Sequence, residues 1–141
     1  MSGPRFVLDA SATLAWAFNE HGRGETFGSL IKDATPVVPW LWCLEVTNAI
    51  LVKERRKVVL PMEGTRLLGL LDNLGVQVVG EPATRKLNAL AQLARSHELS
   101  SYDATYLELA IALALPLFTT DAALQRAAAA CGVPLIWSQE S

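Results

Sequence analysis

The sequence has 141 residues, of which 51% are hydrophobic, and it carries 12 Lys and Arg against 14 Asp and Glu. This length fits one compact domain with a sizeable core, and the charge balance is not that of the usual basic nucleic-acid binder. No segment is typical of a secretory signal or a membrane span, because the longest apolar stretch, residues 37–52, is broken by Pro39, Glu45 and Asn48. We therefore expect a cytoplasmic protein of a single domain covering residues 1–141.

Short apolar runs alternate with longer helical patterns along the chain, and glycines at 75, 80 and 132 separate several of them. The expected strands are residues 6–8, 37–38, 76–79, 117–118 and 135–136. The expected helices are roughly residues 12–18, 24–32, 41–56, 62–73, 83–96, 102–114 and 122–130. This alternation predicts an α/β fold with a mostly parallel sheet and helices on both faces.

The first candidate site residue is Asp9, in the stretch FVLDASATL. The apolar run predicts a buried strand that stops at Asp9 and passes into a helix capped by Ser11. Ligands bind at the carboxyl ends of strands in open α/β sheets, but a single Asp there is as often a turn or cap residue.

The second candidate is Glu45, which interrupts an otherwise apolar helix in PWLWCLEVTNAILVKERRK. A buried, unpaired carboxylate is costly, so Glu45 must reach water, a partner or a cation. Asn48 lies three residues on and shares its helix face, which we expect to be a core-facing stripe with Leu41 and Val52. A buried Glu bonded to a backbone group or to an Arg is the simpler alternative.

Two more acids stand at predicted helix starts, Asp103 in SSYDATYLELA and Asp121 in LFTTDAALQRAAAA. Ser100 and Asp103 have the spacing of a capping box, and a cap would also explain Asp121. Taken together with Asp9, however, they are three acids at junctions that gather along one edge of a parallel sheet, and Glu45 makes four.

Four converging carboxylates would repel one another and raise their pKa values unless a cation held them. Oxygen ligands select hard ions such as Mg²⁺ or Mn²⁺, and such clusters commonly serve phosphoryl chemistry by activating a bound water. Ser11, Asn48 and Thr119 are candidates to orient the acids. The two histidines, His21 and His97, are too few and too scattered for a zinc site, and both cysteines are expected to be reduced thiols.

Four segments, LDASATLAW, VPWLWCLEVTNAIL, LSSYDATYLELA and LFTTDAAL, resemble in order and spacing the signature segments of PIN-domain ribonucleases, in particular VapC-like toxins of type II toxin–antitoxin modules. The resemblance covers roughly residues 6–137. It implies a five-stranded parallel sheet with the first strand central, and a Mg²⁺- or Mn²⁺-dependent endoribonuclease site. The matching site residues are Asp9, Glu45, Asp103 and Asp121, supported by Ser11, Asn48 and Thr119.

The same resemblance implies a homodimer, an RNA substrate and an antitoxin partner. The chain departs from the family pattern in Trp40 and Trp42 and in the loop NEHGRGE, which affects the shape of the substrate groove rather than the chemistry. Apolar side chains on the expected helices indicate some surface for a protein interface, although core packing explains most of them: Trp16, Phe18, Trp40, Trp42, Leu67, Leu68 and Leu71.

Charge is an objection to an RNA substrate, and it weakens when the four candidate ligands are set aside, since ten acids then face twelve bases. The run Lys53–Lys57, joined by Arg85 and Lys86, is the basic cluster, but the end of a helix also favours such cations. A haloacid-dehalogenase-like phosphatase with Asp9 as nucleophile is one alternative, although Ser11 replaces its second Asp and Glu45 stays unexplained. A PIN-like binding module without activity is the other.

Overall fold

The computed structural model describes residues 3–18, 24–80 and 87–136 of the chain. Their elements, in order, are β1 (Arg5–Leu8), α1 (Ala10–Ala17), α2 (Gly24–Asp33), β2 (Thr35–Pro39), α3 (Trp40–Arg55), α4 (Pro61–Asp72), β3 (Gln77–Val79), α5 (Leu87–His97), α6 (Ser101–Leu113), β4 (Leu117–Phe118) and α7 (Ala122–Ala130). The predicted helices all occur, with ends shifted by a few residues; the predicted start of the fifth, at residues 83–86, lies outside the described residues.

The four strands form one parallel sheet in the order β3-β2-β1-β4. Val7 lies opposite Val37 of β2 and Leu117 of β4, so β1 is an inner strand, as predicted. Its side chains from Phe6 to Leu8 are all buried, which is typical of a parallel strand covered on both faces.

The prediction of five strands was wrong for the described part of the chain. Residues 135–136 make a single parallel bridge, Leu117 to Leu135, beside β4. Two backbone hydrogen bonds hold it, from Leu117 N–H to the Pro134 carbonyl at 2.9 Å and from Ile136 N–H to the Leu117 carbonyl at 3.0 Å. Pro134 has no N–H to donate, so the pairing cannot extend toward the N-terminal side.

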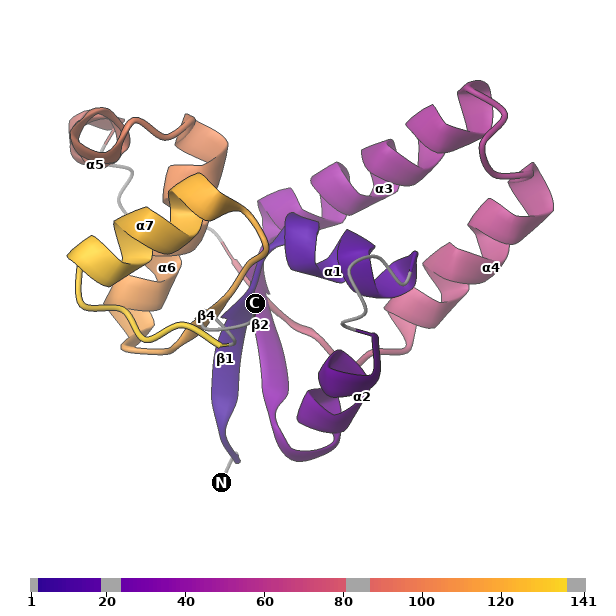
Figure 1. The fold of residues 1–141 in the computed structure, drawn as a ribbon, viewed down its shortest axis with the longest axis horizontal. Coiled ribbons are helices and arrows are strands. Elements are labelled where there is room, and N and C mark those ends of the chain that lie inside the picture. The colour runs from indigo at the N-terminus through magenta and orange to yellow at the C-terminus, as the bar shows by residue number, and fades with distance from the viewer. Residues whose placement is uncertain (1–2, 19–23, 81–86, 137–141) are drawn as a thin grey trace.

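Helices cover the sheet from two sides (Figure 1). Helices α5, α6 and α7 lie on one side, and α1 to α4 lie on the other. Aromatic side chains fill the core between the layers, where the ring centroid of Phe118 lies 6.3 Å from that of Phe6 and 5.6 Å from that of Phe27. The sheet edge that carries Asp9 therefore opens between the two groups of helices.

Helices α3 and α4 form an arm that projects beyond the sheet (Figure 1). The core side of α3 carries Trp42, Val46 and Ile50, which are all buried. The predicted core-facing stripe through Glu45 and Asn48 was therefore misplaced, because Asn48 is exposed and Glu45 half-buried.

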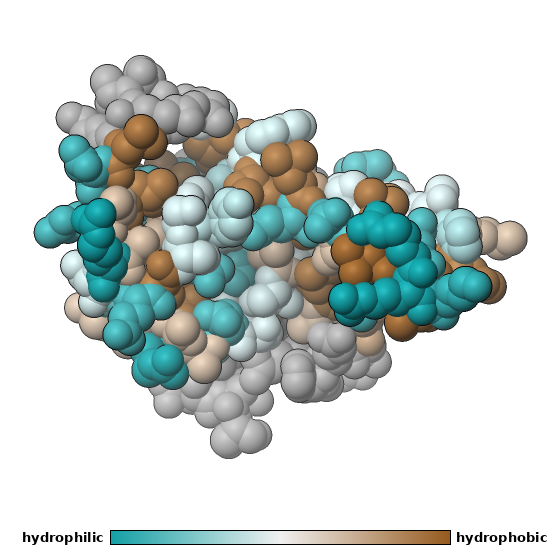
Figure 2. Space-filling view, turned by 90° about the horizontal axis from the view of Figure 1, so that it is seen from above, coloured by the Kyte–Doolittle hydropathy of each residue, from teal (hydrophilic) through white to brown (hydrophobic). Residues whose placement is uncertain are grey.

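Most of the apolar helix residues proposed for an interface pack inside the molecule. Trp42, Leu67 and Leu71 are buried and Trp16, Phe18 and Leu68 pack against the core, whereas Trp40 is exposed. Other apolar side chains are exposed on the arm instead, namely Leu44, Leu51, Val58, Leu60, Met62 and Leu70. Figure 2 shows such hydrophobic patches interspersed with hydrophilic side chains on one face. Among the described residues, no helix is long and apolar enough to cross a membrane.

Candidate active site

All four predicted acids line one open pocket of about 490 Å³. Asp9 follows β1, Glu45 lies in the helix that follows β2, Asp103 stands in the first turn of α6, and Asp121 follows β4. The remaining lining residues are Ala10, Ser11, Leu14, Asn48, Ala49, Tyr102 and Tyr106. The predicted gathering of acids at one edge of the sheet is therefore present, although Asp103 follows helix α5 and does not lie at a strand-to-helix junction as predicted; Ser11 and Asn48 line the same pocket.

Asp9 is almost completely buried, at 2% exposure, and its carboxylate is surrounded by donors. The N–H of Ala12 donates to Oδ1 at 2.9 Å, and the Ser11 hydroxyl lies 2.8 and 2.9 Å from Oδ1 and Oδ2. The Thr119 hydroxyl donates to Oδ2. Asp9 itself is the N-cap of α1, so the prediction that Ser11 caps this helix was wrong: Ser11 binds the cap residue instead.

The donors of Asp9 are themselves held by the strand-to-helix loop after β4. The N–H of Thr120 donates to the Ser11 hydroxyl at 3.1 Å, and the N–H of Asp121 donates to the Thr119 hydroxyl at 3.0 Å. Each of these bonds occupies one acceptor lone pair of a hydroxyl and leaves its proton available to Asp9. Thr119 was predicted as a supporting residue, and it supports Asp9 from outside the pocket lining.

The hydrogen-bond inventory of Asp9 leaves room for one more partner. An ionised carboxylate offers about four lone-pair sites, and each hydroxyl supplies a single proton. Ala12, Ser11 and Thr119 therefore supply three protons, and one acceptor site remains. A cation can occupy that site without displacing a donor.

Glu45 is held by a residue that the sequence did not reveal. The buried Tyr106 hydroxyl donates to Glu45 Oε1 at 2.6 Å, which leaves Oε2 without a hydrogen bond among the described residues. Tyr106 lies three residues after Asp103, on the same side of α6. A sequence signal existed, because a Tyr within a strongly apolar helix needs a partner for its hydroxyl, and Glu45 was the unpaired polar group.

Asp103 and Asp121 are capping residues as well as pocket residues. Ser100 is the N-cap of α6 and accepts from the Asp103 N–H at 3.0 Å, and its side chain also hydrogen-bonds the Asp103 carboxylate. Asp121 is the N-cap of α7, where its Oδ2 accepts from the Leu124 N–H at 2.8 Å. These capping contacts leave further oxygen lone pairs on both carboxylates, so the structural role does not exclude a second one.

The pKa values of three acids are raised, in the direction predicted but chiefly for another reason. Burial raises the pKa of Asp9 from 3.8 to about 6, against the opposing effect of its hydrogen bonds. Burial also raises the pKa of Glu45, which the Tyr106 hydroxyl partly offsets. For Asp103, burial is again the largest cause of a raised pKa, followed by the charge of Asp121. Loss of solvent thus outweighs mutual repulsion.

The donors of this pocket fit a hard divalent cation in kind. They are carboxylate oxygens, with an amide oxygen from Asn48 nearby, and sites of this chemistry select Mg²⁺ or Mn²⁺ over softer ions. No three Asp, Glu, His or Cys side chains within the described ranges are arranged closely enough to hold one ion as they stand.

Other singled-out residues lie apart from the pocket. His97 Nε2 is 3.4 Å from the sulfur of Cys131, and neither residue lines the acidic pocket. Trp42 is buried and donates to the Thr13 hydroxyl at 2.8 Å, so its bulk shapes the core rather than a groove. His21, Arg85 and Lys86 and most of the loop NEHGRGE lie outside the described residues.

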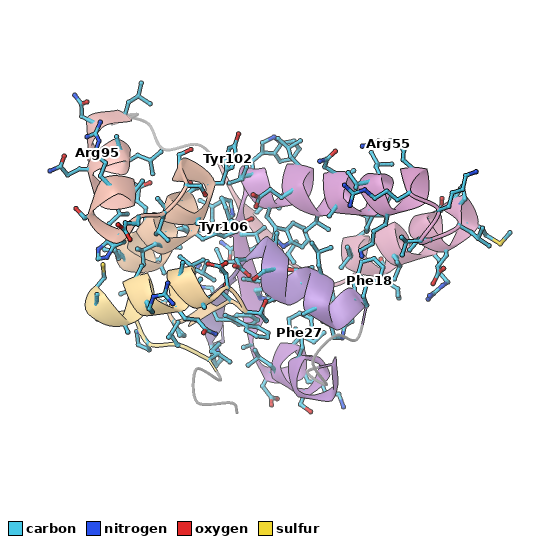
Figure 3. All side chains as sticks on the ribbon, turned by 45° about the horizontal axis from the view of Figure 1, so that its top comes forward. Phe18, Phe27, Arg55, Arg95, Tyr102 and Tyr106 are labelled. Atoms are coloured by element: carbon cyan, nitrogen blue, oxygen red, sulfur yellow. The ribbon has the colours of Figure 1, made fainter. Side chains whose placement is uncertain are left out.

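The basic run lies at the C-terminal end of α3, whereas Glu45 lies near the start of that helix. Lys53 places its ammonium 4.8 Å from the ring centroid of Phe18, whereas Arg55, Arg56 and Lys57 are exposed. Ten residues separate Glu45 from Arg55 in α3, which is about 15 Å of helix. Figure 3 shows Arg55 far along α3 from the two tyrosines at the pocket.

Comparison with known proteins places the fold in a defined family. The PIN domain family model matches residues 6–130. PAE2754 from Pyrobaculum aerophilum aligns with a TM-score of 0.72 at 23% identity, over 96% of this chain and 86% of that one. VapBC2 from Rickettsia felis, solved bound to a DNA fragment from their promoter, aligns with a TM-score of 0.68 at 12% identity, over 94% and 97% of the two chains.

A third similar structure is a domain of a functionally unknown protein from Methanocaldococcus jannaschii, with a TM-score of 0.56 at 18% identity over 98% of this chain and 93% of that one. No curated protein sequence matched the chain. At these identities the structural likeness shows the fold, and the chemistry has to be argued from the pocket.

Proposed function

Since this chain belongs to the PIN-domain family, we propose that its acidic pocket is a Mg²⁺- or Mn²⁺-dependent endoribonuclease centre. One observation carries the proposal: Asp9, Glu45, Asp103 and Asp121 come from four separate parts of the chain and line one pocket. A carboxyl group whose pKa is higher in the folded state than in the unfolded state lowers the stability of the fold at neutral pH. Gathering these carboxylates therefore does not stabilise the protein. A functional requirement explains why these acids lie together.

In this proposal, the four carboxylates hold the cation, which when bound supplies an activated water and neutralises charge on the phosphate. Ser11 and Thr119 keep Asp9 ionised and oriented, with one acceptor site turned to the pocket. Tyr106 holds one oxygen of Glu45 and leaves the other for the cation. The exposed Asn48 amide is placed to orient a water or a phosphate oxygen at the pocket wall.

We further propose that the protein is the toxin of a toxin–antitoxin pair, acting in the cytoplasm as a homodimer. Support comes from the fold, which is shared with VapBC2 over 94% of this chain and 97% of that chain. Exposed apolar side chains on the α3–α4 arm supply a surface for protein contacts. The cognate partner would then cover part of this arm.

A phosphatase that uses Asp9 as a covalent nucleophile is less well supported. A covalent nucleophile at Asp9 leaves the gathering of Glu45, Asp103 and Asp121 in the same pocket unexplained. No lysine is present among the residues that line the pocket, although that chemistry calls for one.

The test is cleavage of total RNA by the purified protein with Mn²⁺, followed by mapping of the cut ends. Asp9→Asn, Glu45→Gln, Asp103→Asn and Asp121→Asn should each lower the rate by at least about 10³-fold. Asp33→Asn, an exposed acid at the end of α2, is the matched control and should cleave normally.

Metal binding gives a second measurement. A hundredfold excess of Mn²⁺ over its dissociation constant should stabilise the wild-type fold by about 2.7 kcal/mol and so raise its melting temperature, but not that of Asp9→Asn. Cleavage that survives in all four variants, or a wild-type melting temperature that Mn²⁺ leaves unchanged, would contradict the proposal.

A further inference from the structure

Two tyrosines of α6 line the acidic pocket, and one is buried while the other is exposed. Tyr106 is 1% exposed and its hydroxyl is bonded to Glu45, whereas Tyr102, one turn earlier, is 60% exposed. The Tyr102 hydroxyl has no hydrogen-bond partner among the described residues, and its ring makes no aromatic pair there. Figure 3 shows both side chains extending from α6 toward the beginning of α3. Tyr106 therefore holds Glu45 in place, whereas the exposed ring of Tyr102 is accessible to a ligand.

The pocket also lacks the groups that usually attract a nucleic acid. None of its lining residues is Lys or Arg, although four of them are acids. The exposed cations at the end of α3 begin about 15 Å further along that helix. The cation bound by the acids can neutralise one phosphate, and an aromatic ring at the pocket can add affinity of another kind, by stacking on a base.

From these observations we propose that Tyr102 is a stacking platform for an unpaired nucleobase of the substrate. This inference rests on the ribonuclease function proposed above, and it assigns one side chain of the pocket to the base of an unpaired nucleotide. Bases that are paired within an A-form helix cannot present their faces to a side chain, whereas unpaired bases stack on aromatic rings.

The position of Tyr102 fits this role better than that of a core or interface residue. Tyr102 directly precedes Asp103, so a base on its ring has its own phosphates within reach of the acids. The pocket volume of about 490 Å³ lies in the range of sites for single small ligands. Stacking also tolerates any base, because every base has a π-face, so Tyr102 contributes affinity rather than sequence preference.

The experiment measures binding without cleavage. A short single-stranded RNA that contains 2-aminopurine is titrated with protein in EDTA, and the quenching of the fluorescent base reports stacking. Tyr102→Leu keeps an apolar side chain but removes the flat ring, and it should raise the dissociation constant by between about 5-fold and about 150-fold, the range for one base–aromatic stack. Tyr102→Phe should bind like the wild type, because the hydroxyl has no partner to lose.

Abasic substitutions identify the stacked base. An abasic site moved along the RNA should weaken wild-type binding most at one position, and at that position Tyr102→Leu should cause no further loss. Ile111→Ala, which removes another exposed apolar side chain of α6 outside the pocket, is the control and should leave binding unchanged.

Equal affinity and equal quenching in the wild type and Tyr102→Leu would overturn the inference. So would a Tyr102→Leu variant that binds RNA normally but changes its sedimentation behaviour, since Tyr102 would then be a protein contact. Neither result bears on the ribonuclease proposal, which is tested separately by RNA cleavage with the four acid variants and by the effect of Mn²⁺ on the melting temperature. Conversely, a protein that stacks the base but never cleaves RNA would retain the platform and lose the proposed function.

Discussion

The two sides of the acidic pocket differ in how completely hydrogen bonds hold their carboxylates in place. On the Asp9 side, a buried carboxylate accepts three hydrogen bonds whose donors are fixed by the loop after β4. On the Asp103 side, a half-buried carboxylate has one hydrogen-bond partner, the Ser100 side chain, in the described part of the chain. Hydrogen bonds from three groups therefore fix Asp9 more completely than the single Ser100 partner fixes Asp103.

The largest effect should come from removing the charge on the Asp9 side. Because the folded pKa of Asp9, about 6, is above its ordinary 3.8, the folded state holds this proton more tightly than the unfolded state. The wild type should therefore lose about 3 kcal/mol of stability from this group as the pH rises from about 4 to about 6. Asp9→Asn removes this dependence, so its stability relative to the wild type should increase over that interval.

Urea denaturation in EDTA between pH 4 and pH 7.5 measures this difference. Glu45 and Asp103 contribute to the slope in both proteins, so subtraction isolates Asp9. If the difference in free energy of unfolding between the two proteins does not change with pH, burial does not raise the pKa of Asp9.

The next effect concerns the donors of Asp9. Thr119→Val removes the hydroxyl that donates to Oδ2 while keeping the side-chain shape, and Mn²⁺ affinity should fall about 10- to 100-fold. Thr120→Val is the matched control, because Thr120 supports Ser11 only through its backbone N–H. Isothermal titration of both variants with Mn²⁺ would decide this, and equal affinities would show that the Asp9 side needs no Thr119.

A smaller effect is expected at Glu45. Tyr106→Phe deletes the hydroxyl that stabilises the ionised Glu45, so the pKa of Glu45 should rise further. Protons then compete with Mn²⁺ at higher pH, and affinity near pH 6 should fall about 10-fold, with partial recovery at pH 8. Tyr102→Phe should leave Mn²⁺ affinity unchanged at both pH values, because that hydroxyl contacts no acid. A loss in Tyr106→Phe that is the same at both pH values would indicate a packing defect instead.

The smallest effect should be found at the histidines. His97 contacts Cys131 outside the pocket, and no chemistry proposed here uses an imidazole. His97→Ala should change stability by less than about 1 kcal/mol and His21→Ala likewise, with RNA cleavage by both variants unchanged. A large loss of cleavage in folded His97→Ala would point to histidine-based ribonuclease chemistry in place of the acids.

The sequence by itself determined the elements and the four acids. Buried strands of a parallel sheet are short continuous apolar runs, so residues 6–8 and 117–118 stood out, and Gly75 and Gly132, both with positive φ, ended helical patterns where expected. An acid within or beside such runs is unusual enough to be noticed. Because parallel strands end at one edge, the sequence order was sufficient to bring Asp9 and Asp121 together, whereas Asp103 follows α5 rather than a strand and reaches the pocket through the packing of α6.

The tertiary structure determined which side chains from distant parts of the chain contact one another. Ser11 was expected to cap α1 but instead binds Asp9, and the packed loop after β4 brings the Thr119 hydroxyl to that carboxylate and the Thr120 N–H to Ser11. Tyr106 finds Glu45 across 61 residues of chain, and local periodicity carries no information about such a contact. Within the described residues the expected fifth strand is a single bridge, where Pro134 supplies no N–H for pairing on its N-terminal side. Burial contributed more than repulsion to the raised pKa values of the acids, because solvent exclusion is a property of the whole fold.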